Sequence, residues 1–183
     1  VGSELAERGA LAMVVALLLI FVYVMIRFQW KFSAGAVAAL AHDAIVTVGF
    51  FSIFGFPFDL TVVAAVLAVI GYSLNDTVVA FDRIRENFLS LRGVSAEEAM
   101  NTSINEMLAR TLITGITTLL VLVALLVLGG ESIAPFSIAL IVGIIIGTYS
   151  SIYTASATAL ALDVSPQDLI EPIKDPDLID DLP

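Results

Sequence analysis

The chain has little charge and no cysteine, and each shortage excludes a class of protein. Of its 183 residues 14% are charged and 59% are hydrophobic, which is more apolar than a soluble domain of this length. The absence of cysteine excludes a disulfide framework, a Cys-based metal site and a Cys nucleophile. The single histidine, His42, excludes a multi-histidine metal site, so we expect neither a metal nor a bound cofactor. Basic and aromatic residues are not interleaved, so no nucleic acid partner is expected.

Long apolar runs fill most of the chain. Five stretches approach the roughly 20 residues that a helix needs to cross a bilayer, and they cover residues 10–26, 34–54, 60–81, 112–128 and 136–162. The apolar spacing is helical throughout, whereas a membrane barrel would show short alternating strands. The sequence therefore predicts an all-α, multi-pass transmembrane bundle of five spans.

Basic residues near the helix ends set the expected orientation. They occur between the first two spans and around the long connection between the third and fourth: Arg27, Lys31, Arg83, Arg85, Arg92 and Arg110. The connections 55–59 and 129–135 hold no lysine or arginine. We therefore expect the N-terminus outside and the C-terminus in the cytoplasm.

The two ends of the chain differ in character. The chain begins with Val1, and Glu4 and Glu7 flank the first span where a signal peptide would be basic. We expect a fragment or processed chain that starts partway through a larger protein. The last segment, 163–183, holds seven acids and one lysine, which accounts for −6 of the net charge of −10. We expect this acidic cytoplasmic tail to lack regular structure.

The long cytoplasmic connection contains a helix start. Ser95 followed by Glu98 is typical of a capping box, in which the two side chains satisfy free backbone N–H groups. This pattern predicts a polar helix over 96–108 that leads into the fourth span. Such a helix is either an ordinary connection or a docking site for a partner.

Small residues recur at every fourth position of the fifth span: Ala139, Gly143, Gly147, Ser151, Ala155 and Ala159. Small side chains let helix backbones approach closely, which membrane helices need because lipid provides no hydrophobic drive for packing. The helix packed on this stripe could belong to this chain or to a second subunit. The second span has a similar face through Gly35, Ala39, Asp43 and Thr47, so Asp43 is expected to face a neighbouring helix.

The third span contains a carboxylate, Asp76, six residues before the next polar landmark, Asp82. That spacing is about 9 Å of helix, too deep for the short side chain to reach water. A charged Asp near a helix centre costs roughly 2.5 to 3.5 kcal/mol. Asp76 therefore needs a partner, a water-filled cavity or a proton, and Arg110 at a similar depth is the candidate partner.

Two readings of this pair stay open. Burial favours the neutral carboxyl and a guanidinium favours the charged one, so Asp76 could take up and release a proton. The pair could instead be a static ion pair, or Arg110 could extend to the headgroups. Polar residues at similar depth are candidate supports: Ser73, Asn75, Thr77, Thr114 and Thr117. Asp43 is a second intramembrane acid, expected to be a hydrogen-bonded packing residue, and His42 is expected to be structural.

Four segments carry a resemblance to a known family. One segment closely resembles the signature of the SecF family, the membrane subunits that work with SecD in bacterial protein export: GYSLNDTVVAFDRIRENF (71–88). RFQWKFSAGAVAALAHD (27–43), RTLITGITTLL (110–120) and GTYSSIYTASA (147–157) agree with it. The resemblance extends to about Leu162.

The resemblance implies a subunit of the proton-driven resistance-nodulation-division group, located in the bacterial inner membrane. Its implied partners are SecD, a SecY-type channel and the translocating polypeptide, its coupling ion is the proton, and it is not an enzyme. The family's proton-site aspartate corresponds to Asp76, its important arginine to Arg110, and another characteristic acid to Asp43.

The chain also departs from the family. SecF proteins have six spans and an extracytoplasmic domain after the first, and this chain matches the last five. Two other functions remain as alternatives: a passive scaffold that links SecD to the channel, and half of a proton-driven small-molecule or lipid exporter.

Overall fold

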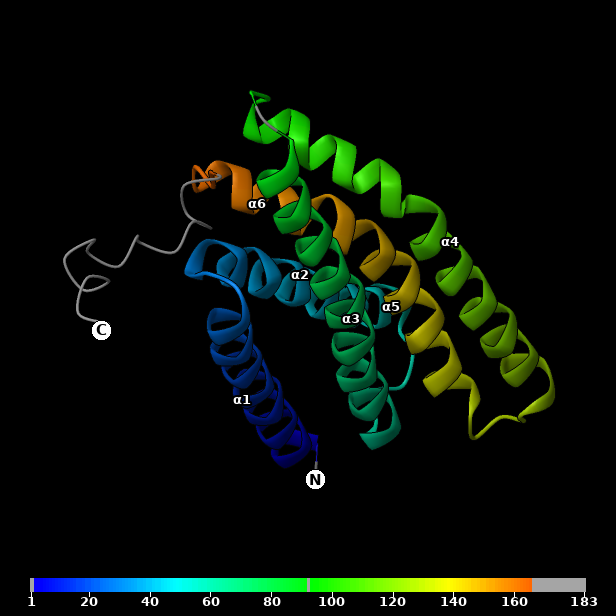
Figure 1. Cartoon of the computed structure of the whole chain (residues 1–183). Coiled ribbons are helices and arrows are strands. Elements are labelled where there is room, and N and C mark those ends of the chain that lie inside the picture. Colours follow the sequence, from blue (N-terminus) through cyan, green and yellow to red (C-terminus); the bar gives the residue numbers. More distant parts are fainter. Residues whose placement is uncertain (1, 92, 166–183) are drawn as a thin grey trace, which may run out of the picture.

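The structure is a computed structural model that describes residues 2–91 and 93–165. Arg92 and the expected acidic tail from residue 166 onward lie outside the described residues. The described part is built of six helices (Figure 1): α1 (Gly2–Arg27), α2 (Trp30–Phe54), α3 (Leu60–Ser90), α4 (Ala96–Leu128), α5 (Ala134–Ile152) and α6 (Thr154–Ala161).

The all-helical prediction is confirmed. Five helical stretches of the described chain are long and apolar enough to cross a membrane, with α5 and α6 counted together as Ala134–Ala161. Backbone polar groups have no water to bond in a bilayer, and a helix satisfies them internally. The bilayer therefore accounts both for the apolar composition and for the helical architecture.

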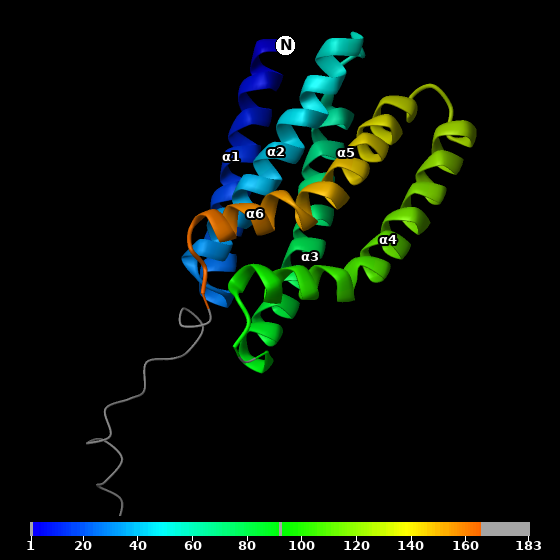
Figure 2. The same ribbon diagram turned by 90° about the horizontal axis from the view of Figure 1, so that it is seen from above.

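Helices α1, α2 and α3 extend beyond the predicted segments 10–26, 34–54 and 60–81, and two predicted divisions of the chain also differ. The expected connecting helix over 96–108 and the expected span over 112–128 form one helix, α4. No proline or glycine lies between these segments to end the helix. Figure 2 shows that α4 changes direction along its length. The expected fifth span divides at Tyr153 into α5 and α6, just after the Ser151 hydroxyl donates to the Thr148 carbonyl at 3.2 Å, a type of bond that often bends helices.

Side chains cap the starts of α3 and α4. Asp59 Oδ1 accepts hydrogen bonds from the backbone N–H groups of Thr61 and Val62 at 2.9 and 3.0 Å. The bond from the Thr61 hydroxyl, followed by that from the Val62 N–H, lowers the pKa of the Asp59 carboxyl below its ordinary value. Ser95 Oγ accepts from the Glu98 N–H at 3.1 Å, which is the first half of the expected capping box.

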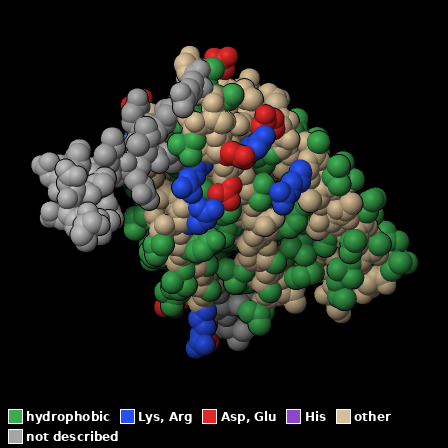
Figure 3. Space-filling view, viewed as in Figure 1, with side chains coloured by type: hydrophobic (Ala, Val, Ile, Leu, Met, Phe, Trp, Pro, Cys, Tyr) green, Lys and Arg blue, Asp and Glu red, His purple; other side chains and the backbone are tan. Residues whose placement is uncertain are grey.

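The connections alternate between the two ends of the bundle. Figure 2 shows the N-terminus, the α2–α3 connection and the α4–α5 connection at one end, and the α1–α2 and α3–α4 connections at the other. Charged side chains gather on the face seen in Figure 3 over the α3–α4 end, whereas the far part of α4 and α5 is largely hydrophobic. This charged end is where the basic residues of the sequence predict the cytoplasm.

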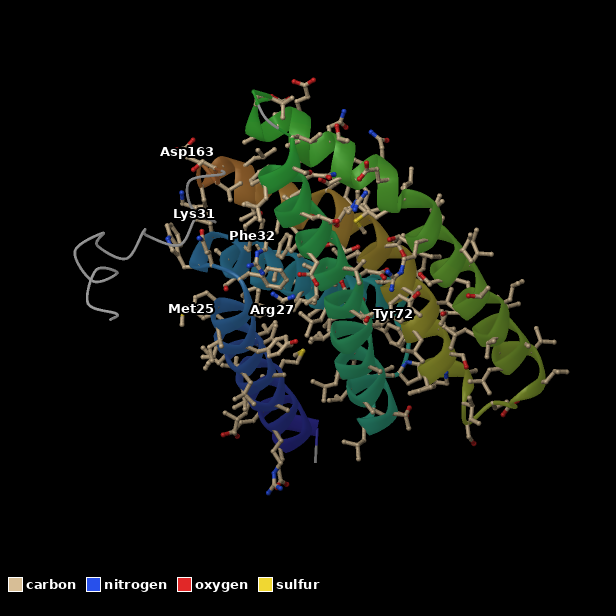
Figure 4. All side chains as sticks on the ribbon, viewed as in Figure 1. Met25, Arg27, Lys31, Phe32, Tyr72 and Asp163 are labelled. Carbon is tan, nitrogen blue, oxygen red and sulfur yellow. The ribbon has the colours of Figure 1, made fainter. Side chains whose placement is uncertain are left out.

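Ion pairs and hydrogen bonds join the helices at the charged end. Arg27 of α1 pairs with Asp82 of α3 at 2.8 Å. Arg83 of α3 pairs with Glu106 of α4 at 2.6 Å. Lys31 Nζ, near the start of α2, donates to the carbonyl oxygen of Asp163 after α6 at 2.9 Å (Figure 4). Exposed pairs of this kind each contribute at most about 1 kcal/mol, so they position the helix ends more than they stabilise the fold.

Helix α3 lies at the centre of the bundle and packs against α1, α2, α4 and α5. Its buried face includes Val62, Val66, Val69 and Ile70, and then turns polar at Ser73. A helix whose apolar face becomes polar partway along carries its polar groups into the bundle interior. The candidate site is built around this part of α3.

Candidate functional site

Three polar side chains of α3 lie on its buried face. Asp76 and Thr77 follow Ser73 by three and four positions, so all three side chains lie on one side of the helix. Their exposed fractions are 1%, 6% and 0%. Asn75, which the sequence grouped with them, is exposed. The helix therefore directs the acid inward and the amide outward.

The Asp76 carboxyl is incompletely satisfied. Its Oδ2 is buried and has no hydrogen-bond partner in the described part of the chain. The Thr77 hydroxyl, on the same face, is likewise buried without a partner. An unsatisfied buried polar atom in a membrane helix is costly and is typical of a functional position.

Arg110 lies on α4, exposed, and acts on Asp76 electrostatically. Within the described residues no ion pair or hydrogen bond joins the two side chains, although the sequence named Arg110 as the candidate partner. Thr114 and Thr117 bond to carbonyl groups of their own helix, at Thr111 and Ile113 among others. The α4 side of the site thus provides a positive charge near Asp76 without a direct contact.

Asp43 of α2 makes the hydrogen bonds that Asp76 lacks. The Ser73 hydroxyl donates to Asp43 Oδ2 at 2.6 Å, and His42 Nδ1 lies 3.3 Å from Oδ1. Asp43 is completely buried, whereas the His42 side chain is 37% exposed. Nearby, the Ser150 hydroxyl of α5 donates to the Ala39 carbonyl of α2 at 3.1 Å. The structure thus joins Asp43 to α3 and places a half-exposed histidine beside it.

The small-residue stripe of the fifth span lies inside this chain's own bundle. A Cβ on Gly143 would overlap the Val69 side chain of α3. A Cβ on Gly147 would lie 3.2 Å from Ser73 Cβ and 3.4 Å from Asp43 Oδ2. The absence of a side chain at Gly147 therefore gives the Asp43–Ser73 pair its space.

The rest of the stripe lies in the same interior. A Cβ on Gly35 of α2 would lie 2.6 Å from the Ala155 carbonyl oxygen of α6, so these two backbones are in close contact. Ser151 is also buried, and so are Ala139 and Ala159. Helices α5 and α6 consequently pack through small residues on α2 and α3.

Sequence reasoning missed a polar cluster at the charged end. Asn87 Nδ2 of α3 donates to Ser103 Oγ at 3.0 Å and to Glu106 Oε2 at 2.9 Å, both on α4. The spacing of the sequence contained a signal for this cluster, because Asn87 follows Arg83 by four positions and Glu106 follows Ser103 by three, so each pair shares a helix face.

Comparisons with known proteins agree with this architecture. The model of a family described as protein export membrane protein SecD/SecF, C-terminal, matches residues 1–165. The chain is 52% identical over 183 residues to the protein translocase subunit SecF of Pseudomonas aeruginosa, covering all of this chain and 60% of that protein. It is 54% identical over 172 residues to the SecF subunit of Vibrio alginolyticus, covering 94% of this chain and 55% of the relative.

A solved structure is similar as well. The crystal structure of SecDF from Thermus thermophilus, a translocon-associated membrane protein, superposes with a TM-score of 0.83 at 45% identity. The match covers 89% of this chain and 23% of that one. A SecDF structure in a super-membrane-facing form gives a TM-score of 0.82. The chain thus spans only part of the length of the proteins that it matches.

Proposed function

The chain belongs to the SecD/SecF family of protein-export membrane proteins, and from that premise we propose that it couples inward proton flow to protein translocation. It acts as the membrane part of a SecF-like subunit in the bacterial inner membrane. Its coupling ion is the proton, and it catalyses no covalent chemistry. Asp76 carries the proton and Arg110 provides the counter-charge.

One observation carries this proposal: Asp76 is buried in α3, and one of its carboxylate oxygens has no partner among the described residues. A purely structural acid in a membrane helix would be expected to have its bonds satisfied. An acid that alternates between two protonation states needs a site that satisfies neither state fully. Asp76 is in such a site, with Arg110 near enough to act electrostatically but not bonded to it.

The relay converts proton movement into a change of helix packing. When Asp76 is charged, attraction to Arg110 favours a closer arrangement of α3 and α4. When Asp76 is neutral, that attraction is absent and a different packing is favoured. One charge crossing a potential of 100 mV is worth about 2.3 kcal/mol, enough to shift an equilibrium between two packings that differ by a few kcal/mol.

The proposed partners follow from the relatives. The Thermus protein is a SecDF that is associated with the translocon. By analogy, this chain works with SecD, a SecY-type channel and the translocating polypeptide. Asn75 supports a polar partner surface, because it is exposed on α3 where lipid would offer it no hydrogen bond.

The proposed orientation places the N-terminus outside and the end of α6 in the cytoplasm. Single cysteines replacing Phe58 and Ser132 should react with an impermeant thiol reagent added to intact cells, because both lie in outer connections. A cysteine replacing Ser90, at the end of α3, should react only after the cells are opened. Because the chain has no cysteine of its own, the unmodified chain is the control. Labelling of the Ser90 variant in intact cells would contradict the proposed orientation.

The test of the function is translocation of a secretory protein into vesicles that contain the complete subunit, its SecD partner and the channel. A proton gradient should increase translocation, and an ionophore that dissipates the gradient should remove the increase. A passive scaffold predicts the same translocation with and without the ionophore. An exporter half predicts that leaving this protein out does not change translocation.

A further inference from the structure

The second buried acid of the bundle, Asp43, is placed where a proton can enter and leave it. Three side chains form a row from the outer face of α2 into the bundle: His42, Asp43 and Ser73. His42 is half-buried at the outer end of the row, and Ser73 lies at its inner end, on α3. The row therefore connects the surface of the bundle with the helix that carries Asp76.

We propose that Asp43 is a second proton-carrying residue, which exchanges a proton with His42 and hands it on toward Asp76. The inference rests on the proposed proton coupling and adds a path to it. The relay through Asp76 and Arg110 uses α3 and α4. The path proposed here enters from the opposite side, through α2.

The His42–Asp43 pair can hold one extra proton in two places. With the proton on the imidazole, a positive ring lies beside a negative carboxylate. When the proton leaves Nδ1 and binds Oδ1, a neutral ring lies beside a neutral carboxylic acid. The net charge of the pair is zero in both arrangements, so the exchange does not add net charge to the membrane interior. The 3.3 Å separation of Nδ1 and Oδ1 places both positions within reach of one proton.

No other cation competes for the Asp43 carboxyl in the described part of the bundle. Helices α5 and α6, which pack against α2, contain no charged residue. Away from their ends, the other helices carry Asp76 on α3 and Glu106 and Arg110 on α4, whereas His42 Nδ1 lies 3.3 Å from Asp43 Oδ1. The polar groups that act on the charge of the Asp43 carboxyl are the Ser73 and Ser150 hydroxyls and the His42 ring.

Ser73 connects the pair with Asp76. Its hydroxyl donates to Asp43 Oδ2 at 2.6 Å, and Asp76 follows it by three positions on the same buried face of α3. One helical turn is about 5.4 Å, so one water molecule or one side-chain rotation spans the remaining gap. Asp76 Oδ2, which has no partner in the described residues, can accept the proton. Gly147 of α5 keeps this region free of a further side chain.

The experiment uses the complete subunit with its SecD partner and the channel in vesicles, with translocation measured with and without a proton gradient. The variants are Asp43→Asn, His42→Gln and Ser73→Ala. Ser33→Ala is the matched control, because Ser33 is also a buried serine but its hydroxyl donates to the carbonyl of Gln29, just before α2, and not to another helix of the described bundle. Each variant of the row should lose most of the gradient-dependent increase, and the control should keep it.

A second measurement separates a proton carrier from a packing residue. Infrared difference spectra of the purified complex at two pH values should contain a carboxylic acid band that disappears in Asp43→Asn and shifts in Ser73→Ala, because that variant removes a hydrogen bond. If Asp43→Asn does not assemble, Ser73→Ala and His42→Gln decide the question by the same two measurements. Unchanged bands in Asp43→Asn and Ser73→Ala would overturn the inference.

Comparison with Asp76→Asn separates failure of the path through Asp43 from failure of the proposed proton coupling. If Asp76→Asn loses the gradient-dependent increase while the three row variants keep it, the path through Asp43 is wrong and the proposed function stands. If Asp76→Asn also keeps the full increase, both are wrong. Loss of the increase in Asp76→Asn and in the row variants, with Ser33→Ala unaffected, supports both.

Discussion

Asp76→Asn is expected to insert and fold nearly normally and to lose the gradient-dependent increase in translocation. The amide keeps the shape of the carboxyl and can still hydrogen-bond, but it cannot alternate between a neutral and a charged form. Arg110→Gln should also weaken the increase, because the charged form of Asp76 loses the counter-charge that acts on it. The measurement is gradient-dependent translocation into vesicles that contain equal amounts of each variant.

The double variant, Asp76→Asn with Arg110→Gln, distinguishes a relay from a static pair. A static pair predicts that each single variant loses stability and that the double variant recovers it, since both charges are removed together. A relay predicts that the double variant remains as inactive as Asp76→Asn alone. Asp59→Asn is the matched control, because it removes a carboxylate outside the spans and asparagine also caps helices well. Full activity of the double variant would contradict the proton relay and support the passive scaffold.

Gly147→Leu is expected to reduce the amount of assembled complex, and Gly143→Leu to reduce it further. A side chain at Gly147 would meet Ser73 and Asp43, and one at Gly143 would overlap Val69. Overpacking of a filled interior costs about 1 to 3 kcal/mol and sometimes more. Here the α5 backbone itself lies against its neighbours, so the helix has to move away from α3.

Gly71→Leu is the control for both glycine variants. Gly71 lies in the middle of α3, but nothing lies within 4 Å of a Cβ built there. The three variants therefore add the same volume to membrane helices, and only two of them add it to a filled interface. The measurements are the yield of the complex and its melting temperature in detergent. Equal yield and melting temperature for Gly147→Leu and Gly71→Leu would contradict the close packing of α5 on α3.

Much of the fold could be predicted from composition and spacing. Apolar runs near the length of a membrane span predicted the five long helices, because a bilayer accepts few other backbone conformations. The helix predicted over 96–108 was expected to lead into the fourth span, and the two form one continuous helix because no proline or glycine lies between them. The cap at Asp59 was missed although an Asp before an apolar helix is a typical start signal.

The sequence named candidate residues for the site but not the contacts between them. The cost of placing a charge in lipid identified Asp76, Asp43 and Arg110 as candidates, because that cost does not depend on which helices surround them. That cost also made Arg110 the candidate partner of Asp76, whereas the structure bonds Asp43 to Ser73 and leaves one Asp76 oxygen without a partner in the described chain. Spacing along one helix defines a face, but it does not define which neighbour that face meets.

By itself, the sequence determined the helices, the intramembrane acids and the end of the bundle that carries the basic residues. These depend on transfer of individual groups between water and lipid, a property of each residue and its near neighbours along the chain. Only the tertiary structure decided that α3 is central, that Gly147 approaches Ser73, and that Asp43 bridges α2 and α3. Those contacts join residues 30 or more positions apart. They depend on how all helices rotate to fill one interior, because each rotation is set by side chains on several neighbours at once.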